Sequence, residues 1–493
     1  MRANNKAGLG TIRLSIQLPV QRRALGFCLC VLLLGGCTVG PKYVRPTAEV
    51  PADYKENADW KPAQPADERV KGKWWEVYQD SQLNALEEKV DVSNQSLKAA
   101  QAQFLEARAA LRVSRSGLFP TVTANPLISR DRVSANRPLA VAGGTTNYAD
   151  YQFPAVDASY EADVWGRVRR TVEASRSEAQ ASAADLASVG LSLHAELAMD
   201  YFQLRGLDAQ KQLLDSTVAS YQKALDLTQT RYNGGLASAV DVAQAQTQLE
   251  TARAQSIDVE VQRAAFEHAI AVLIGQPASK FSLSALPLTT PPPAIPPGLP
   301  SDLLERRPDI SAAERRMQEA NAQIGVAKAA YFPTITLSGG GGFESIALGT
   351  LFQGPSGLWA VGGAAAETLF DAGKRRGVSE QAWAVYDQSV DNYRQTVLTA
   401  FQEVEDNLAA LRILQSEAQT EQVAVAAAQH SVDLSLTRYK GGVTNYLEVT
   451  TAQSAALTDE VTAVTILTRR MTASVLLIKA IGGGWNVSQI PPV

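Results

Sequence analysis

The hexapeptide Arg-Tyr-Asn-Gly-Gly-Leu at residues 231–236 recurs 207 positions later as Arg-Tyr-Lys-Gly-Gly-Val at residues 438–443. The same offset relates Asp241 to Glu448, and Gly166 to Gly373. Self-similarity at a fixed spacing indicates an internal duplication rather than a series of independent domains. We therefore expect two halves with one plan, each built around its own copy of the hexapeptide.

Long proline-free stretches surround both hexapeptides. Residues 155–276 and 356–490 contain no proline and are rich in Ala, Gln, Leu and Glu, which favour helix. The paired glycines of each hexapeptide are a turn signal. We expect helical hairpins at about 166–275 and about 372–481, with first arms roughly 100 Å long at 1.5 Å per residue. A 4-3-4-3 apolar spacing typical of coiled coils supports this: Val397, Phe401, Val404, Leu408 and Leu411.

The periodicity changes to two before Gly166. Apolar residues from Val156 to Val164 alternate with Asp157, Ser159, Glu161 and Asp163, which predicts a strand with one polar face. Such alternation suits a membrane-spanning strand whose acids Asp157, Glu161 and Asp163 face a lumen. The second half alternates from Thr334 to Ser338 and returns near Trp359 to Leu369. We expect β-hairpins at about 120–165 and about 333–370, and a soluble two-stranded ribbon is the alternative.

Two strands in each half give only four strands per chain. Four strands cannot close a barrel, and open sheet edges are not tolerated in lipid. Three copies would supply twelve strands, an even number within the known range. The predicted fold is mainly α with a transmembrane β part, in which duplicated halves form a trimeric 12-stranded β-barrel joined to a long α-helical barrel of coiled coils. The segments expected are a first half at 37–286 that begins with an equatorial segment, a Pro-rich strap at 287–300 and a second half at 301–493.

The N-terminus has the pattern of a lipoprotein signal peptide. Residues 1–36 carry five basic side chains and no acid, and an apolar run of 11 residues precedes Gly35-Gly36-Cys37. That run is too short for a membrane-spanning helix, and we expect no other stretch of that kind. Acylation of Cys37 would anchor the chain in a membrane. An ordinary signal peptide followed by a buried cysteine is the alternative.

Composition excludes several functional classes. The 493 residues are 45% hydrophobic, with 46 basic and 50 acidic side chains, and a net charge of −4 gives no basic footprint for nucleic acid. His194, His268 and His430 are widely separated and have no cysteine partners in the mature chain, so we expect no metal and no cofactor. We find no catalytic constellation and expect no enzyme; an exported lipoprotein enzyme is the rival hypothesis.

Several short motifs, in this order, resemble one known family. They are Gly36–Tyr43, Trp74-Trp75, Arg306–Ile310, Tyr331-Phe332-Pro333, Leu369-Phe370-Asp371 and the two hexapeptides. Together they resemble the TolC-like outer membrane efflux proteins (outer membrane factors) of the lipidated multidrug-efflux type. The resemblance implies a homotrimeric, passive exit duct for small molecules, fed by an inner-membrane pump of the resistance-nodulation-division type through a periplasmic adaptor protein. A type I protein secretion channel and a structural periplasmic coiled-coil lipoprotein are the alternatives.

The hexapeptides are the expected contact with the adaptor. Helix ends expose unpaired backbone groups, and glycine lets a partner's backbone approach closely. The residues expected at this tip are Arg231, Gly234, Gly235, Arg438, Gly441 and Gly442. Plain helix-terminating glycines are the alternative.

Two acids near the tip are candidates for a gate. Asp241 and Glu448 follow the turns, and three copies would bring six carboxylates to one mouth, where like charges repel. Lys440 and the two hexapeptide arginines are the nearest compensating cations, so links between neighbouring hairpins could hold the mouth shut. Some relatives have an acid at Thr444 and Thr451, where this chain has hydroxyls. Solvated surface acids are the alternative.

Overall fold

The computed structural model describes residues 38–48, 50–57, 72–132, 134, 147–295 and 300–490. The expected signal peptide, Cys37 and residues 296–299 of the Pro-rich strap lie outside the described residues. The chain divides into two compact units. The sheet unit contains Ser114–Glu173, Ala322–Ala382 and the described residues up to Lys42; the helical unit contains Tyr43–Val113, Ala174–Asn321 and the described residues from Trp383 onward.

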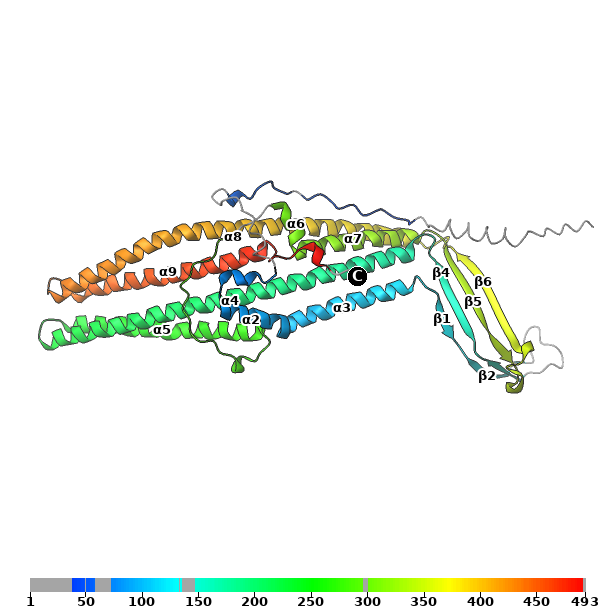
Figure 1. Cartoon of the computed structure of the whole chain (residues 1–493), viewed down its shortest axis with the longest axis horizontal. Coiled ribbons are helices and arrows are strands. Elements are labelled where there is room, and N and C mark those ends of the chain that lie inside the picture. Colours follow the sequence, from blue (N-terminus) through cyan, green and yellow to red (C-terminus); the bar gives the residue numbers. More distant parts are fainter. Residues whose placement is uncertain are drawn as a thin grey trace, which may run out of the picture. The chain divides into compact units, whose positions relative to one another are not determined.

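The sheet unit holds an antiparallel sheet in which β5 is central (Figure 1). β4 pairs with β1 and β5, β5 also pairs with β3 and β6, and β3 pairs with β2. In the main ladder Ala158 lies opposite Gly339, and Gly339 lies opposite Val361. The strands are β1 (Thr121–Ala124), β2 (Leu127–Arg132), β3 (Asn147–Gln152), β4 (Val156–Ala162), β5 (Thr334–Ser345) and β6 (Gly357–Ala366).

The first half contains four strands where the sequence suggested two. Pro126 separates β1 from β2, and Pro154 separates β3 from β4. Proline cannot donate to a sheet ladder and interrupts a strand. β5 has no proline and continues for 12 residues. The two expected arms of the first hairpin are therefore present, each divided at a proline, and the second half has two strands as expected.

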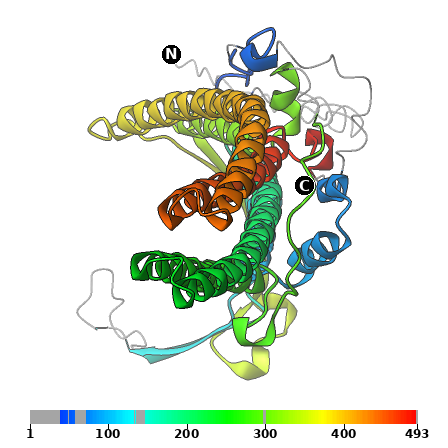
Figure 2. The same ribbon diagram turned by 90° about the vertical axis from the view of Figure 1, so that its left-hand side faces the viewer.

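Four long helices form two hairpins. Hairpin 1 consists of α4 (Arg167–Asn233) and α5 (Ala239–Leu273), and hairpin 2 consists of α8 (Lys374–Lys440) and α9 (Tyr446–Ala480). Both first arms have 67 residues and both second arms have 35, so the duplication has kept length closely. Figure 2, seen from the turn end, shows the two hairpins beside each other.

The same backbone motif ends α4 and α8. The amide of Leu236 donates to the Arg231 carbonyl, and the amide of Val443 donates to the Arg438 carbonyl. Gly235 and Gly442 take positive φ angles of 72° and 75°. This is the Schellman arrangement, in which a left-handed glycine ends a helix.

Four shorter helices accompany the long ones in the described residues. They are α2 (Ser81–Ser93), α3 (Gln95–Ser116), α6 (Leu303–Arg306) and α7 (Pro308–Ala329). Single 3₁₀ turns occur at Lys55–Asn57, Trp74–Tyr78, Ala278–Lys280, Pro300–Asp302, Leu348–Thr350, Gly354–Ser356 and Val487–Gln489.

One continuous core joins these helices inside the helical unit. It combines Leu83 and Leu86 of α2 with Tyr201 of α4 and Val475 of α9, all less than 4% exposed. The five residues of the coiled-coil spacing on α8 belong to this core, as their spacing predicts.

α9 is apolar enough to cross a membrane by length and composition, with a mean hydropathy of 1.4 over its best window. The expectation that no such stretch follows the leader was wrong by this criterion. Nearly half of the window, 44%, is buried inside the chain. Val475, Leu477 and Ile478 are fully buried in the core, so packing accounts for the apolar composition of this helix.

Candidate functional site

The two hairpin turns expose apolar groups at their tips. Gly234, Gly235, Gly441 and Gly442 are all exposed. The next side chains, Leu236 and Val443, are 72% and 71% exposed. Each turn therefore presents bare backbone and one exposed apolar side chain.

The two hexapeptide arginines make different contacts. Arg231 reaches from hairpin 1 to hairpin 2, where its Nη1 donates to the Lys440 carbonyl at 2.9 Å and its guanidinium lies 4.9 Å from the centre of the Tyr439 ring. Arg438 remains on its own hairpin, with its Nε 3.4 Å from Glu448 Oε1. The sequence placed both arginines at the tip but gave no means to separate these roles.

The two candidate gate acids also differ. Asp241 forms a capping box at the start of α5: its carboxylate accepts from the Ser238 amide at 3.0 Å, and its own amide donates to Ser238 Oγ at 3.2 Å. Glu448 accepts from Thr444 Oγ1 at 2.5 Å and pairs with Arg438. The Asp241 carboxylate is thus used in the cap of its own helix, whereas the Glu448 carboxylate forms an ion pair with Arg438 within hairpin 2.

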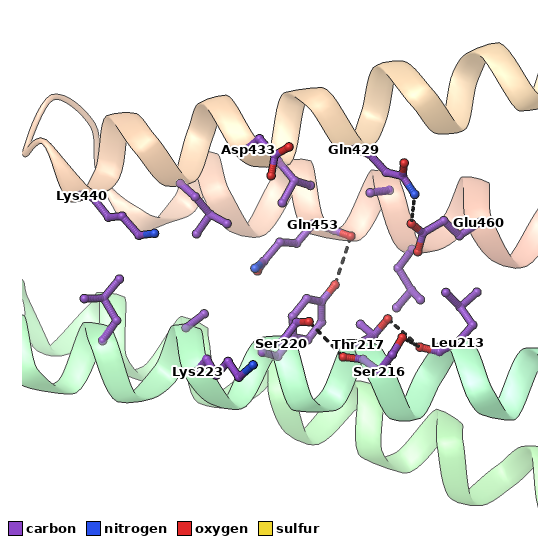
Figure 3. Close-up of a pocket in the computed structure, with 17 residues that line it drawn as sticks. Leu213, Ser216, Thr217, Ser220, Lys223, Gln429, Asp433, Lys440, Gln453 and Glu460 are labelled. Carbon is purple, nitrogen blue, oxygen red and sulfur yellow. Dashed lines mark hydrogen bonds between the residues drawn. The ribbon is translucent and has the colours of Figure 1, made fainter.

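A cavity of about 560 Å³ lies between the hairpins behind the tip (Figure 3). Tyr221 of hairpin 1 lines the cavity, and its hydroxyl donates to the Gln453 carbonyl of hairpin 2 at 3.1 Å. Lys223 and Lys440 line it together with Asp433 and Glu460. The lining is therefore of mixed charge, and the Lys440 side chain belongs to this groove.

The acidic face of β4 is shorter than expected. Asp157 and Glu161 lie on the strand, where Asp157 accepts from Asn125 at 3.3 Å and Glu161 pairs with Arg167. Asp163 lies one residue beyond the strand and accepts from the amides of Val168 and Arg169, both at 2.9 Å. The position of Asp163 on the strand was a wrong expectation, because the first turn of α4 has unpaired amides that a carboxylate satisfies.

Comparison with known proteins explains this combination of sheet and long hairpins. The family model described as outer membrane efflux protein matches residues 86–276 and 299–483, which include both hairpins. The chain belongs to the outer membrane efflux protein family. This is a family of outer membrane channels and not of enzymes.

Individual relatives cover nearly the whole of this efflux protein. The probable efflux pump outer membrane protein TtgC of Pseudomonas putida is 33% identical over 467 residues, which cover 94% of this chain and 95% of that protein. The outer membrane protein OprJ of Pseudomonas aeruginosa is 32% identical, with coverages of 93% and 95%. The solved structure of the outer-membrane channel OprN superimposes with a TM-score of 0.85 at 29% identity, and covers 91% of this chain and 100% of that one.

The residues that follow Cys37 pack against the sheet unit of the efflux protein. We call this binding site of the N-terminal segment the N-terminal seat. The Val39 amide donates to the Trp165 carbonyl at 3.1 Å, and Arg170 donates to the Pro41 carbonyl at 3.0 Å. Gly40 lies so close to α7 that a side chain there would come within 2.6 Å of the Gly325 backbone. Gly325 and Arg170 therefore fix the position of the backbone just after Cys37.

A comparison of the two halves could have indicated this seat. The positions that correspond to Arg170 and Gly325 in the other half are Gly377 and Arg112. The counterpart of this site, formed by Gly377 and Arg112, thus lacks both the guanidinium and the close approach, so only the site at Arg170 and Gly325 can hold the N-terminal segment in this way.

A buried group of titratable side chains lies in the helical unit of the efflux protein. His194 Nδ1 is 2.8 Å from Glu87 Oε2, and His194 Nε2 is 3.1 Å from Asp91 Oδ1. Glu87 is fully buried, and burial raises its pKa to about 7 despite the hydrogen bond from His194. Burial lowers the pKa of His194, but Glu87 and Asp91 outweigh it and raise that pKa above its ordinary value.

Nothing in the sequence placed either acid beside His194. Both acids lie on one face of α2, four residues apart, but more than 100 residues from His194 in the chain. Among the described residues no group of three or more His, Cys, Asp or Glu side chains is placed to hold a metal ion.

Proposed function

We propose that this chain forms, as a homotrimer, the outer membrane channel of a tripartite efflux system, a passive exit duct for small molecules such as drugs. The observation that carries the proposal is the open sheet. In the described part of the chain β6 pairs only with β5, and β1 pairs only with β4, so both ends of the main ladder keep unpaired backbone groups. In lipid these groups need partners, which neighbouring copies supply.

The outer faces of these strands support a place in the membrane. Trp359 and Val361 on β6 are 81% and 80% exposed, and Ile128 on β2 is 77% exposed. Three copies of this sheet would close one barrel, with Asp157 and Glu161 facing its lumen.

The proposed protein partners are inferred from the hairpin tips. Exposed glycine turns at the ends of both hairpins provide the contact for a periplasmic adaptor, and the adaptor connects the channel to an inner-membrane pump of the resistance-nodulation-division type. The relatives TtgC and OprJ support this, since TtgC is described as the outer membrane protein of an efflux pump. The N-terminal seat supports acylation at Cys37, because it fixes the residues that follow the cysteine.

A deletion strain tests the function. Expression of this chain, with its own pump and adaptor, in a strain without outer membrane efflux channels should lower drug susceptibility at least fourfold. Native mass spectrometry of the purified protein should report three chains. A monomer that keeps its strand signal, or unchanged susceptibility with a trimer present in the outer membrane, would refute the proposal.

A further inference from the structure

The cavity between the two hairpins contains a buried polar group that the chain itself leaves unpaired. Its volume of about 560 Å³ lies within the range of about 300–1,000 Å³ that is usual for small-molecule sites. Gln453 is only 5% exposed, yet its side-chain Oε1 is buried without a hydrogen-bond partner. A buried polar atom without a partner is costly, and a bound molecule can supply the missing hydrogen bond. Figure 3 shows the Gln453 side chain in the space between α4 and α8.

Two lysines reach the part of the cavity nearer the turns from opposite sides. Lys223 belongs to α4 and Lys440 to α8 (Figure 3). Both residues are exposed, and within the described residues neither ammonium has an ion pair or a hydrogen bond. The hydroxyls of Thr217 and Ser220 differ, because each donates to a carbonyl of α4 itself at 3.0 Å. The two ammonium groups and the Gln453 amide are therefore free to bind an anionic group such as a carboxylate.

Two acids line the cavity farther from the turns. Glu460 follows Gln453 by seven residues on α9, so it lies about 10 Å farther along the same face of that helix. Its Oε1 accepts from Gln429 Nε2 at 2.6 Å. Asp433 precedes Lys440 by seven residues on α8, and its carboxylate has no partner among the described residues. The lining thus has a cationic end and an anionic end, separated along the hairpins.

Apolar side chains make up much of the remaining lining. They come from both hairpins and are half-buried: Leu213, Leu227, Val432, Leu436 and Leu457. A ligand that covers them removes apolar surface from water, which favours binding. A molecule with an apolar body and a charged group at each end therefore matches the lining.

We propose that this cavity is a binding site for a small amphipathic zwitterion. Lys223, Lys440 and the Gln453 amide hold its carboxylate. Asp433 and Glu460 hold its ammonium, so the bound molecule connects α4 of hairpin 1 to α8 and α9 of hairpin 2. The spacing along α9 favours charges about 10 Å apart. The site lies within one chain, so the proposal goes beyond the proposed channel function and does not depend on it.

A pair of matched probes tests the site. The zwitterion is 8-aminooctanoate, whose extended chain separates a carboxylate from an ammonium by a comparable distance, and octanoate is the same molecule without the ammonium. Isothermal titration calorimetry on the purified full-length protein, at one fixed detergent concentration, gives the Kd of each. We expect the Kd of octanoate to be at least fivefold higher. Uptake of a probe by the detergent is the same for every variant and cancels in the comparison.

Three variants change the lining one group at a time. Lys223→Gln and Gln453→Leu should each raise the Kd of both probes at least fivefold, because each removes a partner of the carboxylate. The Gln453→Leu variant keeps the backbone carbonyl to which Tyr221 donates. Glu460→Gln should raise the Kd of 8-aminooctanoate at least fivefold and leave that of octanoate within twofold. Glutamine can still accept from Gln429 but has no charge for the ammonium.

Lys98→Gln is the matched control, since it removes an exposed lysine of α3 outside the cavity and should leave both Kd values within twofold. Native mass spectrometry of each variant checks the assembly. The proposal is overturned if 8-aminooctanoate does not bind the unmodified protein, or binds it and the three lining variants with one Kd. It is also overturned if Glu460→Gln weakens octanoate as much as 8-aminooctanoate. Either result in a trimer that still lowers drug susceptibility leaves the proposed function standing.

Discussion

The His194 ring stacks on the Trp75 indole, with ring centroids 4.5 Å apart and planes inclined by 23°. Trp75 is 4% exposed and belongs to the main core of the helical unit. The stacked pair holds the imidazole between Glu87 and Asp91, so a titratable group is fixed inside the packing that joins α2 to α4. The stability of this region should therefore depend on pH.

The sign follows from the directions of the two pKa shifts. The folded pKa of Glu87, about 7, lies above its unfolded value, and that of His194 is also raised. Both groups favour the protonated form in the fold, so their stabilisation is complete at low pH and is lost as pH rises through their folded pKa values. We predict that the apparent melting temperature falls by roughly 5 °C between pH 5.5 and pH 8.5.

Glu87→Gln should flatten this dependence, because glutamine is neutral at every pH and can still hydrogen-bond His194. Asp91→Asn is the matched control, since Asp91 is more than half exposed and contributes less to the shift. Thermal unfolding followed by tryptophan fluorescence measures both. A slope in Glu87→Gln equal to that of the unmodified protein would contradict the assignment.

A second prediction concerns the seat of the N-terminal segment. Gly325→Leu adds a side chain where Gly40 and Arg170 contact α7, so it should displace residues 38–42 and expose them to hydrogen exchange. We expect at least tenfold faster exchange in this segment and a smaller fraction of protein in the outer membrane. Gly377→Leu is the control, because a side chain at Gly377 meets nothing within 4 Å. Equal exchange rates in the two variants would show that the seat does not hold the segment.

Much of the fold could be predicted from the sequence because its determinants are local. Proline-free stretches and the hexapeptide turns placed both helical hairpins, and the alternation around β4 placed the sheet. The contacts that assign roles are not local. Arg231 and Arg438 have identical neighbours in sequence, yet one clamps the second hairpin and the other pairs with Glu448. Which arginine contacts the other hairpin depends on how the hairpins pack. The repeated sequence alone does not distinguish the two arginines.

The breaks at Pro126 and Pro154 were, in contrast, readable. Each of these prolines removes a backbone donor from the ladder, which divides each arm of the expected hairpin into two strands. Backbone donors also decide the position of Asp163, whose carboxylate accepts from the unpaired amides at the start of α4 instead of continuing the strand.

The third prediction tests the tip as an adaptor contact without straining the backbone. Gly234 and Gly441 precede the left-handed glycines and have room for a side chain, with the nearest atoms 3.6 and 3.5 Å from an added Cβ. Gly234→Trp and Gly441→Trp should add bulk at the contact and abolish drug resistance, a fall of at least fourfold in inhibitory concentration, with the trimer intact.

Alanine at the same two positions is the control for the tip. It introduces a Cβ but little bulk, so resistance should remain within twofold of that of the unmodified protein. Full resistance in both tryptophan variants would exclude these turns from the contact.

The last prediction separates the two acids near the tip. Asp241 completes the capping box of Ser238 at the start of α5, so Asp241→Ala should weaken this cap and destabilise the turn by about 1 kcal/mol while leaving conductance unchanged. Glu448 pairs with Arg438 within hairpin 2, so Glu448→Gln should remove one of the acid–cation links that the sequence predicts at the mouth. We expect the single-channel open probability of Glu448→Gln to rise about threefold, as for the loss of one exposed ion pair. Arg438→Ala should raise it by a similar factor, because it removes the other partner of the same pair. Planar bilayer recordings at two salt concentrations measure all three variants. If Asp241→Ala changes gating and Glu448→Gln does not, the roles assigned from their hydrogen bonds are reversed.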